Sequence, residues 1–190
     1  MILPIRAFGD PVLRKVGREI DADYPGLKEL IDNMFETMYG ANGIGLAAPQ
    51  IGLDIRLFVV DIRPLAEDED YEAVAEELKD FKKVFINARI LEQSGEEWKF
   101  NEGCLSIPEV REDVKRKETI VVDYWDENFV HHTETFSDIR ARVIQHEYDH
   151  IEGILFTDHL SALKKKLVKG KLQKIAKGEV DVNYKMRFPK

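Results

Sequence analysis

The sequence has a single cysteine, Cys104, among its 190 residues, so no disulfide bond can form within the chain. It has no hydrophobic run near the roughly 20 residues that a membrane-spanning helix needs. Its apolar start, residues 1–6, is too short for a signal peptide. A hydrophobic content of 44% and a charged content of 34% are typical of a globular chain. We therefore expect a cytoplasmic protein with no membrane segment, in which a thiol stays reduced.

The segment His146-Glu147-Tyr148-Asp149-His150 has the form His-Glu-x-x-His. Residues four apart lie one above the other on a helix, so both imidazoles can reach one metal ion. Glu147 lies beside the first histidine and can accept a proton from a water molecule that the metal activates. The motif therefore favours metal-dependent hydrolysis over the alternative, a surface helix with two scattered histidines.

The residues around this motif favour a helix that carries the histidines near its apolar face. Val143 and Ile139 precede the first histidine by three and seven residues and share its face. Gly153 stands where a helix would end in a left-handed residue, and Ser137 is a candidate N-cap. The pattern predicts one amphipathic helix over residues 137–152.

A third ligand would decide the class of hydrolase. One group of enzymes continues the motif with x-x-Gly-x-x-His, but Phe156 occupies that histidine position. Another group takes a downstream glutamate, and beyond the helix only Glu179 remains, in a basic tail. The upstream candidates are Cys104, His131 and His132, of which the two histidines lie in a predicted strand and are interpreted as ordinary strand residues.

Cys104 has a specific context, Glu102-Gly103-Cys104-Leu105-Ser106. A lone cysteine is most often a small buried residue. Here the preceding glycine allows a close backbone approach, and a thiolate is a strong ligand for a divalent transition metal. Two imidazoles and one thiolate leave a fourth position open for water, as a catalytic site requires.

Three segments together resemble the signatures of the peptide deformylases. They are Gly43-Ile44-Gly45-Leu46-Ala47-Ala48-Pro49-Gln50, residues 102–106 and residues 145–153. The resemblance covers most of the chain and implies removal of formate from the N-terminal formylmethionine of newly made proteins. A zinc endopeptidase is the alternative, since it would use the same water chemistry. A non-catalytic module stabilised by metal is a third interpretation, but it would need a fourth ligand.

The resemblance also implies a metal site. Its expected ligands are Cys104, His146 and His150. Glu147 resembles the general base of the family, which later acts as the acid. One divalent ion is expected, with iron(II) favoured by the resemblance and zinc, nickel or cobalt also suited to these ligands. Gln145 and Asp149 lie beside the ligands and could orient the imidazoles, although Asp149 could equally solvate the helix surface.

Further residues resemble those that bind the substrate in the family. The side-chain amide of Gln50 and the backbone N–H of Leu105 are expected to be oxyanion donors. The backbone of Gly45 is expected to pair with the substrate peptide. The methionine pocket is expected to be lined by Ile44, Ile139 and Val143. Arg142 occupies a wall position where an apolar residue would be expected, and we expect its stem to line the pocket while its head reaches water.

Hydrophobic spacing predicts an α+β fold in a single domain, residues 1–190. Residues 26–39 have the spacing of an amphipathic N-terminal helix. Strands are predicted at residues 55–61, 84–90, 98–100, 119–125 and 129–136. The helix with the His-Glu-x-x-His motif is expected to pack against these mostly antiparallel strands.

Two segments extend this core. Residues 66–80 carry eight acids and one lysine and resemble an insertion, expected to be a solvated loop or short helix. Residues 160–177 hold seven lysines and no acids, and Ser161 is a candidate N-cap for a helix there. This basic helix is interpreted either as a plain surface helix or as a contact with ribosomal RNA.

The tail, residues 178–190, has alternating apolar residues like an edge strand. It is expected to fold onto the sheet or onto a neighbouring subunit. We expect neither a membrane nor DNA as a partner.

Overall fold

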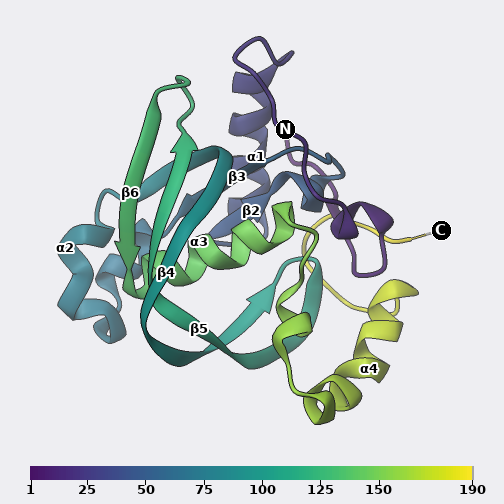
Figure 1. Cartoon of the computed structure of the whole chain (residues 1–190). Coiled ribbons are helices and arrows are strands. Elements are labelled where there is room, and N and C mark those ends of the chain that lie inside the picture. Colours follow the sequence, from purple (N-terminus) through teal and green to yellow (C-terminus); the bar gives the residue numbers. More distant parts are fainter. Residues whose placement is uncertain (190) are drawn as a thin grey trace.

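The computed structural model describes residues 1–189, which form a five-stranded sheet, a two-stranded sheet and four α-helices (Figure 1). The five strands are β2 (Gly45–Ala47), β3 (Leu57–Asp61), β4 (Lys82–Cys104), β5 (Ile107–Trp125) and β6 (His131–Ser137). They lie in the order of the sequence, and every neighbouring pair runs antiparallel. The expected α+β class with mostly antiparallel strands is confirmed.

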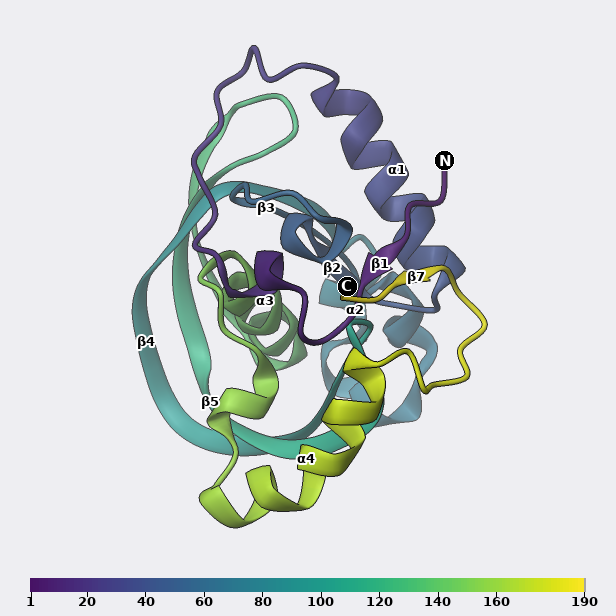
Figure 2. The same ribbon diagram turned by 90° about the vertical axis from the view of Figure 1, so that its right-hand side faces the viewer.

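Strands β4 and β5 form a long ribbon that curves around α3 (Asp138–Ile151), as Figures 1 and 2 show. The sequence predicted separate strands at residues 84–90 and 98–100, but both belong to β4, which is 23 residues long. Between them, residues 91–97 are mostly polar and exposed. The pairing with β5 also shifts register there. These residues therefore lack the hydrophobic pattern by which a strand is recognised.

Strand β3 separates the two helices that cover the sheet. Leu57 and Val59 pack in one core cluster with α1 (Leu27–Gly40), whereas Phe58 and Val60 pack in a second with α3. Successive side chains of a strand point to opposite faces, so both faces of β3 are buried. The N-terminal helix and the helix of the His-Glu-x-x-His motif are thus both present, and α3 is held against the sheet.

The two ends of α3 differ from each other in how they are capped. Gly153 follows the helix with a φ of 72°, as the sequence predicted. At the start, Ser137 occupies the N-cap position, but its side chain makes no capping bond. The carboxylate of Asp138 accepts from the backbone N–H of Arg140 at 3.0 Å instead, so the expected serine cap is corrected to an aspartate one residue later.

The acidic segment covers part of the core next to the sheet. It consists of short helical turns, η3 (Arg63–Glu67), η4 (Glu69–Val74) and α2 (Ala75–Leu78). Leu78 is buried, and Tyr71 and Val74 pack against the same cluster as α3. The segment is therefore attached to the fold by its few apolar residues, while its acids remain on the surface.

The basic C-terminal helix, α4 (Ala162–Ala176), begins as predicted. The hydroxyl of Ser161 accepts from the backbone N–H of Lys164 at 3.3 Å. Val168 and Ile175 are buried in a third core cluster that also includes Ile107 of β5. The helix therefore rests on the protein along one narrow face and leaves its lysine-rich face outward.

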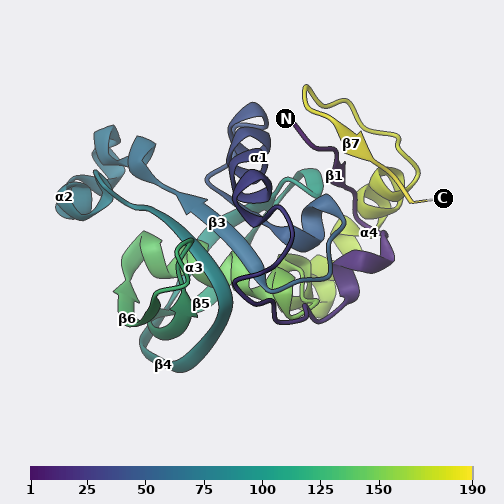
Figure 3. The same cartoon turned by 90° about the horizontal axis from the view of Figure 1, so that it is seen from above.

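The tail returns to the start of the same chain. Strand β7 (Met186–Arg187) pairs in parallel with β1 (Ile5–Arg6), apart from the main sheet (Figure 3). The N–H of Ile5 donates to the carbonyl of Lys185 at 2.9 Å. The two ends of the chain thus hold each other. Within residues 1–189, no helix is both long enough and apolar enough to pass through a bilayer.

Candidate active site

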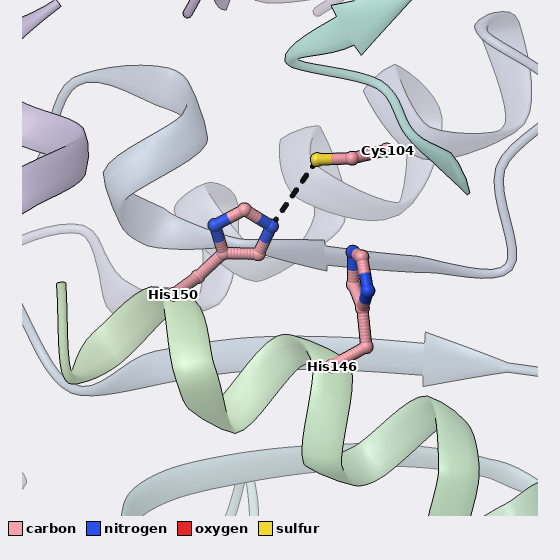
Figure 4. Close-up of side chains that lie close together, drawn as sticks. All are labelled: Cys104, His146 and His150. Atoms are coloured by element: carbon pink, nitrogen blue, oxygen red, sulfur yellow. Dashed lines mark hydrogen bonds between the residues drawn. The ribbon is translucent and has the colours of Figure 1, made fainter. Parts of the chain in front are cut away.

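The side chains of Cys104, His146 and His150 converge at the end of β4 (Figure 4). One ligand atom from each residue lies within 4.8 Å of the others. The Sγ of Cys104 is 3.3 Å from Nε2 of His150. The histidines come from one face of α3, and the cysteine comes from the strand that curves over it. A thiolate and two imidazoles in this arrangement fit one divalent transition metal ion.

A buried carboxylate, Glu102, fixes the orientation of one of these rings. Its Oε2 lies 3.0 Å from Nδ1 of His146, which leaves the other ring nitrogen facing Cys104. Glu102 itself is bound by Arg116, whose Nε donates to Oε1 at 2.7 Å. No role for Glu102 was predicted from the sequence. The available signal was an acid two residues before the only cysteine.

The charges of the site favour a thiolate. Burial alone would raise the pKa of Cys104, but the charge of His150 and hydrogen bonds from both histidines lower it to about 5. Burial alone would lower the pKa of His146, but its contacts with Cys104 and Glu102 raise it well above its usual value. The cysteine is therefore in the form that binds a metal ion.

Glu147 faces the same cavity with its side-chain carboxylate. Its side chain is buried, and its Oε2 has no hydrogen-bond partner among residues 1–189. Burial raises the pKa of Glu147 to about 7. A buried carboxylate with a free oxygen and a pKa near neutrality is suited to exchanging protons with a bound molecule.

Gln50 lies across the site from α3, in the turn η2 (Ala48–Ile51). Its Oε1 accepts from the N–H of Ala47 at 2.9 Å, so its amide nitrogen points the other way. That nitrogen is 3.5 Å from Sγ of Cys104 and 3.2 Å from Oγ of Ser106. Leu105 follows the cysteine directly in the β4–β5 turn, so both expected oxyanion donors lie beside the expected metal ligand.

A cavity of about 280 Å³ opens at this point. Its wall includes Ile44, Gly45, Phe100 and Val143. From the residues named above it also includes Gln50, Glu102, Cys104, Leu105, His146 and Glu147. Ile139 does not line this cavity, because it is buried one turn earlier in the core cluster beneath α3. Phe100 was missed from the sequence, since it belongs to a short strand segment with no motif.

Gly45 is required by the close approach of Glu147. A Cβ on Gly45 would lie 2.3 Å from Oε1 and 2.8 Å from Cγ of Glu147, so the buried Glu147 side chain would have to move out of its position. Gly45 lies on β2, at the edge of the sheet, and pairs on its inner side with Val60 of β3. In the part of the chain that the structure describes, no strand pairs with its outer edge, which can therefore pair with an extended peptide.

The guanidinium of Arg142 does not reach solvent, contrary to the prediction from the sequence. The residue is 1% exposed, and its guanidinium donates to Oε1 of Glu102 at 3.0 Å. It also donates to the carbonyls of Trp98 and Val114 at 2.7 and 3.1 Å. The carboxylate of Glu102 explains the difference, because it offers a buried partner that a sequence pattern does not reveal.

The neighbours of the histidines have different roles from each other. Gln145 donates to the carbonyls of Lys117 and Ala141, so it ties α3 to β5 rather than orienting an imidazole. Asp149 is largely buried and accepts from Arg116 at 2.8 Å. It therefore extends the network of Glu102 and does not simply solvate the helix surface. His131 and His132 lie on β6 and bond to nearby aspartates, outside the cluster of three ligands.

Comparison with known proteins agrees with this geometry. A family model described as polypeptide deformylase matches residues 2–166. A peptide deformylase of Christiangramia forsetii is 63% identical over 190 residues, which cover 100% of this chain and 97% of that protein. One of Flavobacterium johnsoniae is 60% identical over 189 residues, covering 99% of this chain and 96% of that protein.

Solved structures give the same result. A peptide deformylase from Legionella pneumophila superposes with a TM-score of 0.79 at 37% identity, covering 94% of this chain and 98% of that one. A Plasmodium falciparum peptide deformylase with inhibitor has a TM-score of 0.76 at 33% identity, covering 91% and 99%. The alternative of a zinc endopeptidase finds no support among these relatives. The chain belongs to the polypeptide deformylase family, metal-dependent hydrolases that remove the N-formyl group from nascent peptides.

Proposed function

We propose that this chain performs the deformylase reaction in the cavity beside Cys104, His146 and His150, which hold one divalent metal ion. The observation that carries the proposal is the convergence of these three ligand atoms within 4.8 Å, beside a cavity that Cys104, His146, Glu147 and Gln50 line. A structural metal site would need a fourth protein ligand. Among residues 1–189, the cluster of possible ligands has only these three members.

Iron(II) is the proposed ion, and zinc, nickel and cobalt are suited to the same ligands. When bound, such an ion acidifies water and polarises a carbonyl oxygen. The thiolate of Cys104 gives the site a negative charge that an all-histidine site lacks. Glu102 keeps the ring of His146 turned toward the ion by bonding its other nitrogen.

Glu147 is proposed to move the proton of the reaction. Its raised pKa of about 7 lets the carboxylate accept a proton from the attacking water near neutral pH. The same group, once protonated, can deliver that proton to the departing amine. Its unpartnered Oε2 supports this role, because a buried oxygen without a protein partner is available to water or substrate.

Gln50 and Leu105 are proposed to stabilise the negative charge on the formyl oxygen as water adds. The amide nitrogen of Gln50 is turned toward Cys104, and the Leu105 N–H belongs to the residue that follows it. Donors fixed before the reaction stabilise the transition state more than the ground state.

The substrate is proposed to lie along the free edge of β2, with its backbone paired to Gly45. Its methionine side chain would then enter the cavity between Ile44, Phe100 and Val143. Ile139 lies behind this wall and supports α3 rather than touching the substrate. The buried guanidinium of Arg142 closes part of the cavity in place of an apolar side chain.

The lysine-rich face of α4 is proposed to contact ribosomal RNA, where nascent chains emerge. Residues 160–177 hold seven lysines, of which six are exposed, at positions 165, 166, 169, 171, 174 and 177. Among residues 1–189, Lys164 is the one of these lysines with an ion-pair partner, Glu112 at 2.7 Å. Unpaired exposed lysines are free to bind phosphates, which supports contact with a nucleic acid.

Formate release from formyl-Met-Ala-Ser by protein purified without oxygen tests the proposal, with metal analysis of the same sample. We expect release of formate by an iron form that holds one ion per chain and loses activity in air. Unformylated Met-Ala-Ser should remain intact. A protein that binds one metal ion but releases no formate would contradict the proposed function, and equal activity of air-stable iron and zinc forms would contradict the choice of iron.

A further inference from the structure

The turn between β4 and β5 carries two proposed catalytic features in adjacent residues. Cys104 ends β4 and supplies the thiolate, and Leu105 follows with the N–H of the oxyanion site. Cys104 pairs with Ile107 across the turn, so two residues, Leu105 and Ser106, make the connection. The position of this turn therefore affects the metal ligand and the oxyanion donor together.

Residues distant in the sequence hold the turn. The carbonyl of Ser106 accepts from the N–H of Phe8 at 2.8 Å. The hydroxyl of Ser106 lies 3.2 Å from the amide nitrogen of Gln50. The carbonyl of Leu105 accepts from the hydroxyl of Tyr184 at 2.8 Å. Tyr184 belongs to the C-terminal tail, 79 residues further along the chain.

Backbone hydrogen bonds between the tail and the N-terminal segment fix the position of the Tyr184 hydroxyl. Immediately after Tyr184, the carbonyl of Lys185 accepts from the N–H of Ile5, and that of Arg187 accepts from Ala7, both at 2.9 Å. Figures 2 and 3 show β7 lying beside β1. The residue after Ala7 is the one that binds Ser106. The same N-terminal segment thus holds the tail and the turn.

Side-chain packing restrains the tyrosine further. The ring of Tyr184 and the side chain of Leu105 are half-buried against the same core cluster. The next inward-facing tail residues, Met186 and Phe188, pack against the cluster that also contacts Cys104. The hydroxyl therefore approaches the carbonyl from a fixed direction.

We propose that Tyr184 is a positioning residue, whose hydroxyl fixes the Leu105 carbonyl and thereby aims the Leu105 N–H at the formyl oxygen. A hydrogen bond on this carbonyl restricts rotation of the backbone at Leu105, and a small error in the placement of a donor weakens it most in the transition state. The C-terminal tail is then part of the active site. This inference rests on the proposed function, because it assumes the oxyanion role of Leu105.

Tyr184→Phe tests the inference, since it removes the hydroxyl and keeps the ring. Tyr71→Phe is the matched control, because Tyr71 is another half-buried tyrosine and packs in the acidic segment against a different cluster. In the zinc-loaded and iron-loaded proteins, we expect kcat of Tyr184→Phe to fall about tenfold with KM changed less than about twofold. Melting temperatures of the two variants should match each other closely.

A second measurement detects a change in the β4–β5 turn independently of enzymatic activity. The Leu105 carbonyl and the Ser106 N–H share one peptide unit, so loss of the bond should move the Ser106 amide signal in nitrogen-15 NMR spectra of the zinc form. The control variant should leave that signal in place. A kcat within about twofold of the parent value would overturn the positioning role. An unmoved Ser106 signal would also overturn it.

Failure of the positioning role and failure of the proposed function give different experimental results. If Glu147→Gln is inactive and the parent is active, a normal kcat in Tyr184→Phe overturns the positioning role and leaves the proposed function intact. If the parent protein releases no formate, the proposed function fails, and the positioning role is overturned with it. A drop in melting temperature with unchanged kcat would reduce Tyr184 to a stabilising residue and overturn the inference.

Discussion

At the scale of single residues, the carboxylate of Glu102 joins the metal site to the interior. It is 3% exposed and contacts Arg116, Arg142 and His146. A buried charge is tolerated only when partners compensate for the lost water. Because these partners lie on β5 and α3, the contacts that keep Glu102 charged also fix His146 relative to the curved ribbon.

Replacing Glu147 with glutamine should abolish turnover and keep the metal. The amide has nearly the shape of the carboxylate but cannot accept the proton, so we expect kcat to fall by about 10²–10⁴-fold. Metal content and melting temperature should be close to those of the parent. Formate release and metal analysis on one sample check this. Residual activity above about a few per cent would contradict the role of Glu147 as the base.

Replacing Gln50 with alanine should lower kcat by about 10²–10³-fold, because one oxyanion donor is lost, equivalent to about 3–4 kcal/mol of barrier. The same change removes the bond to the Ala47 N–H, so its effect on stability must be measured beside it. Gln50→Glu is the matched variant, since it keeps the acceptor and loses the donor. Full turnover in Gln50→Glu would remove Gln50 from the oxyanion site.

The sequence predicted His146, His150 and Glu147 because their roles depend on residue type and on helical spacing within one segment, and it predicted Cys104 through its motif and the family resemblance. It predicted neither the role of Glu102 nor the burial of Arg142. Those two residues are 40 positions apart. Only the curvature of the ribbon over α3 brings them together, and no local pattern encodes that curvature.

At the scale of elements, the end of a helix could be predicted from the sequence, whereas the bend of a strand could not. The end of α3 was predicted because a glycine in the left-handed region is a strong local signal. The bend of β4 was missed because exposed polar residues pair there without a hydrophobic face. The packing of α3 against the strands was predicted from periodicity, whereas the length of the β4–β5 ribbon depended on pairing between distant segments.

Gly153→Ala tests the end of α3. At Gly153, φ is 72°, and a Cβ would lie 2.7 Å from the carbonyl oxygen of Arg14. We expect the free energy of unfolding to fall by about 1–3 kcal/mol, measured by urea denaturation. Gly170→Ala is the control, because Gly170 lies within α4 and nothing is within 4 Å of an added Cβ.

The control should change stability in the opposite direction. Alanine in the interior of a helix is favoured over glycine by about 0.5–1 kcal/mol, so Gly170→Ala should stabilise the protein slightly. A Gly153→Ala variant as stable as the parent would show that the backbone after α3 relaxes, and that its left-handed turn is not required.

At the scale of the whole molecule, buried carboxylates make stability depend on pH. Asp61 is 2% exposed and is bound by Arg63 and by the hydroxyl of Tyr39. Burial alone would raise the pKa of Asp61, but the bonds from Arg63 and Tyr39 lower it below its usual value. Burial alone would also raise the pKa of Glu102. The hydrogen bonds and charges of His146 and Arg116 outweigh this effect and hold that pKa well below its usual range.

The direction of the effect follows from proton uptake. A carboxyl group with a lower pKa in the folded state binds more protons when the chain unfolds, so stability falls as pH decreases. The contribution is complete above the unfolded pKa, about 4, and is lost at lower pH. We expect the free energy of unfolding to decline below about pH 5.

Asp61→Asn isolates one part of this dependence away from the metal site. The variant should be less stable than the parent at pH 7, and the difference should shrink toward pH 3. Urea denaturation with a chelator present removes the effect of metal release. Asp32→Asn, at an exposed position of α1, is the control. A difference for Asp61→Asn that is independent of pH would contradict a lowered pKa.

Charge is divided unequally over the molecule, which carries a net charge of −8. The acidic segment with α2 and the basic helix α4 lie on opposite sides, as Figures 1 and 3 show. A protein of this net charge would be repelled by RNA on average. Binding therefore requires an orientation that presents α4 and turns the acidic segment away.

Replacing Lys166 and Lys169 with glutamate tests this orientation, because both are exposed on α4. We expect co-sedimentation with ribosomes to be lost, and binding of the parent to weaken steeply as salt rises, since each lysine–phosphate contact releases counterions. Turnover of formyl-Met-Ala-Ser should stay unchanged, because both lysines are exposed and no residue of α4 lines the cavity. Glu69→Lys with Glu72→Lys, in the acidic segment, is the matched control for a change of total charge. If that control alters ribosome binding as much as the α4 variant does, net charge rather than the lysine-rich face governs the contact.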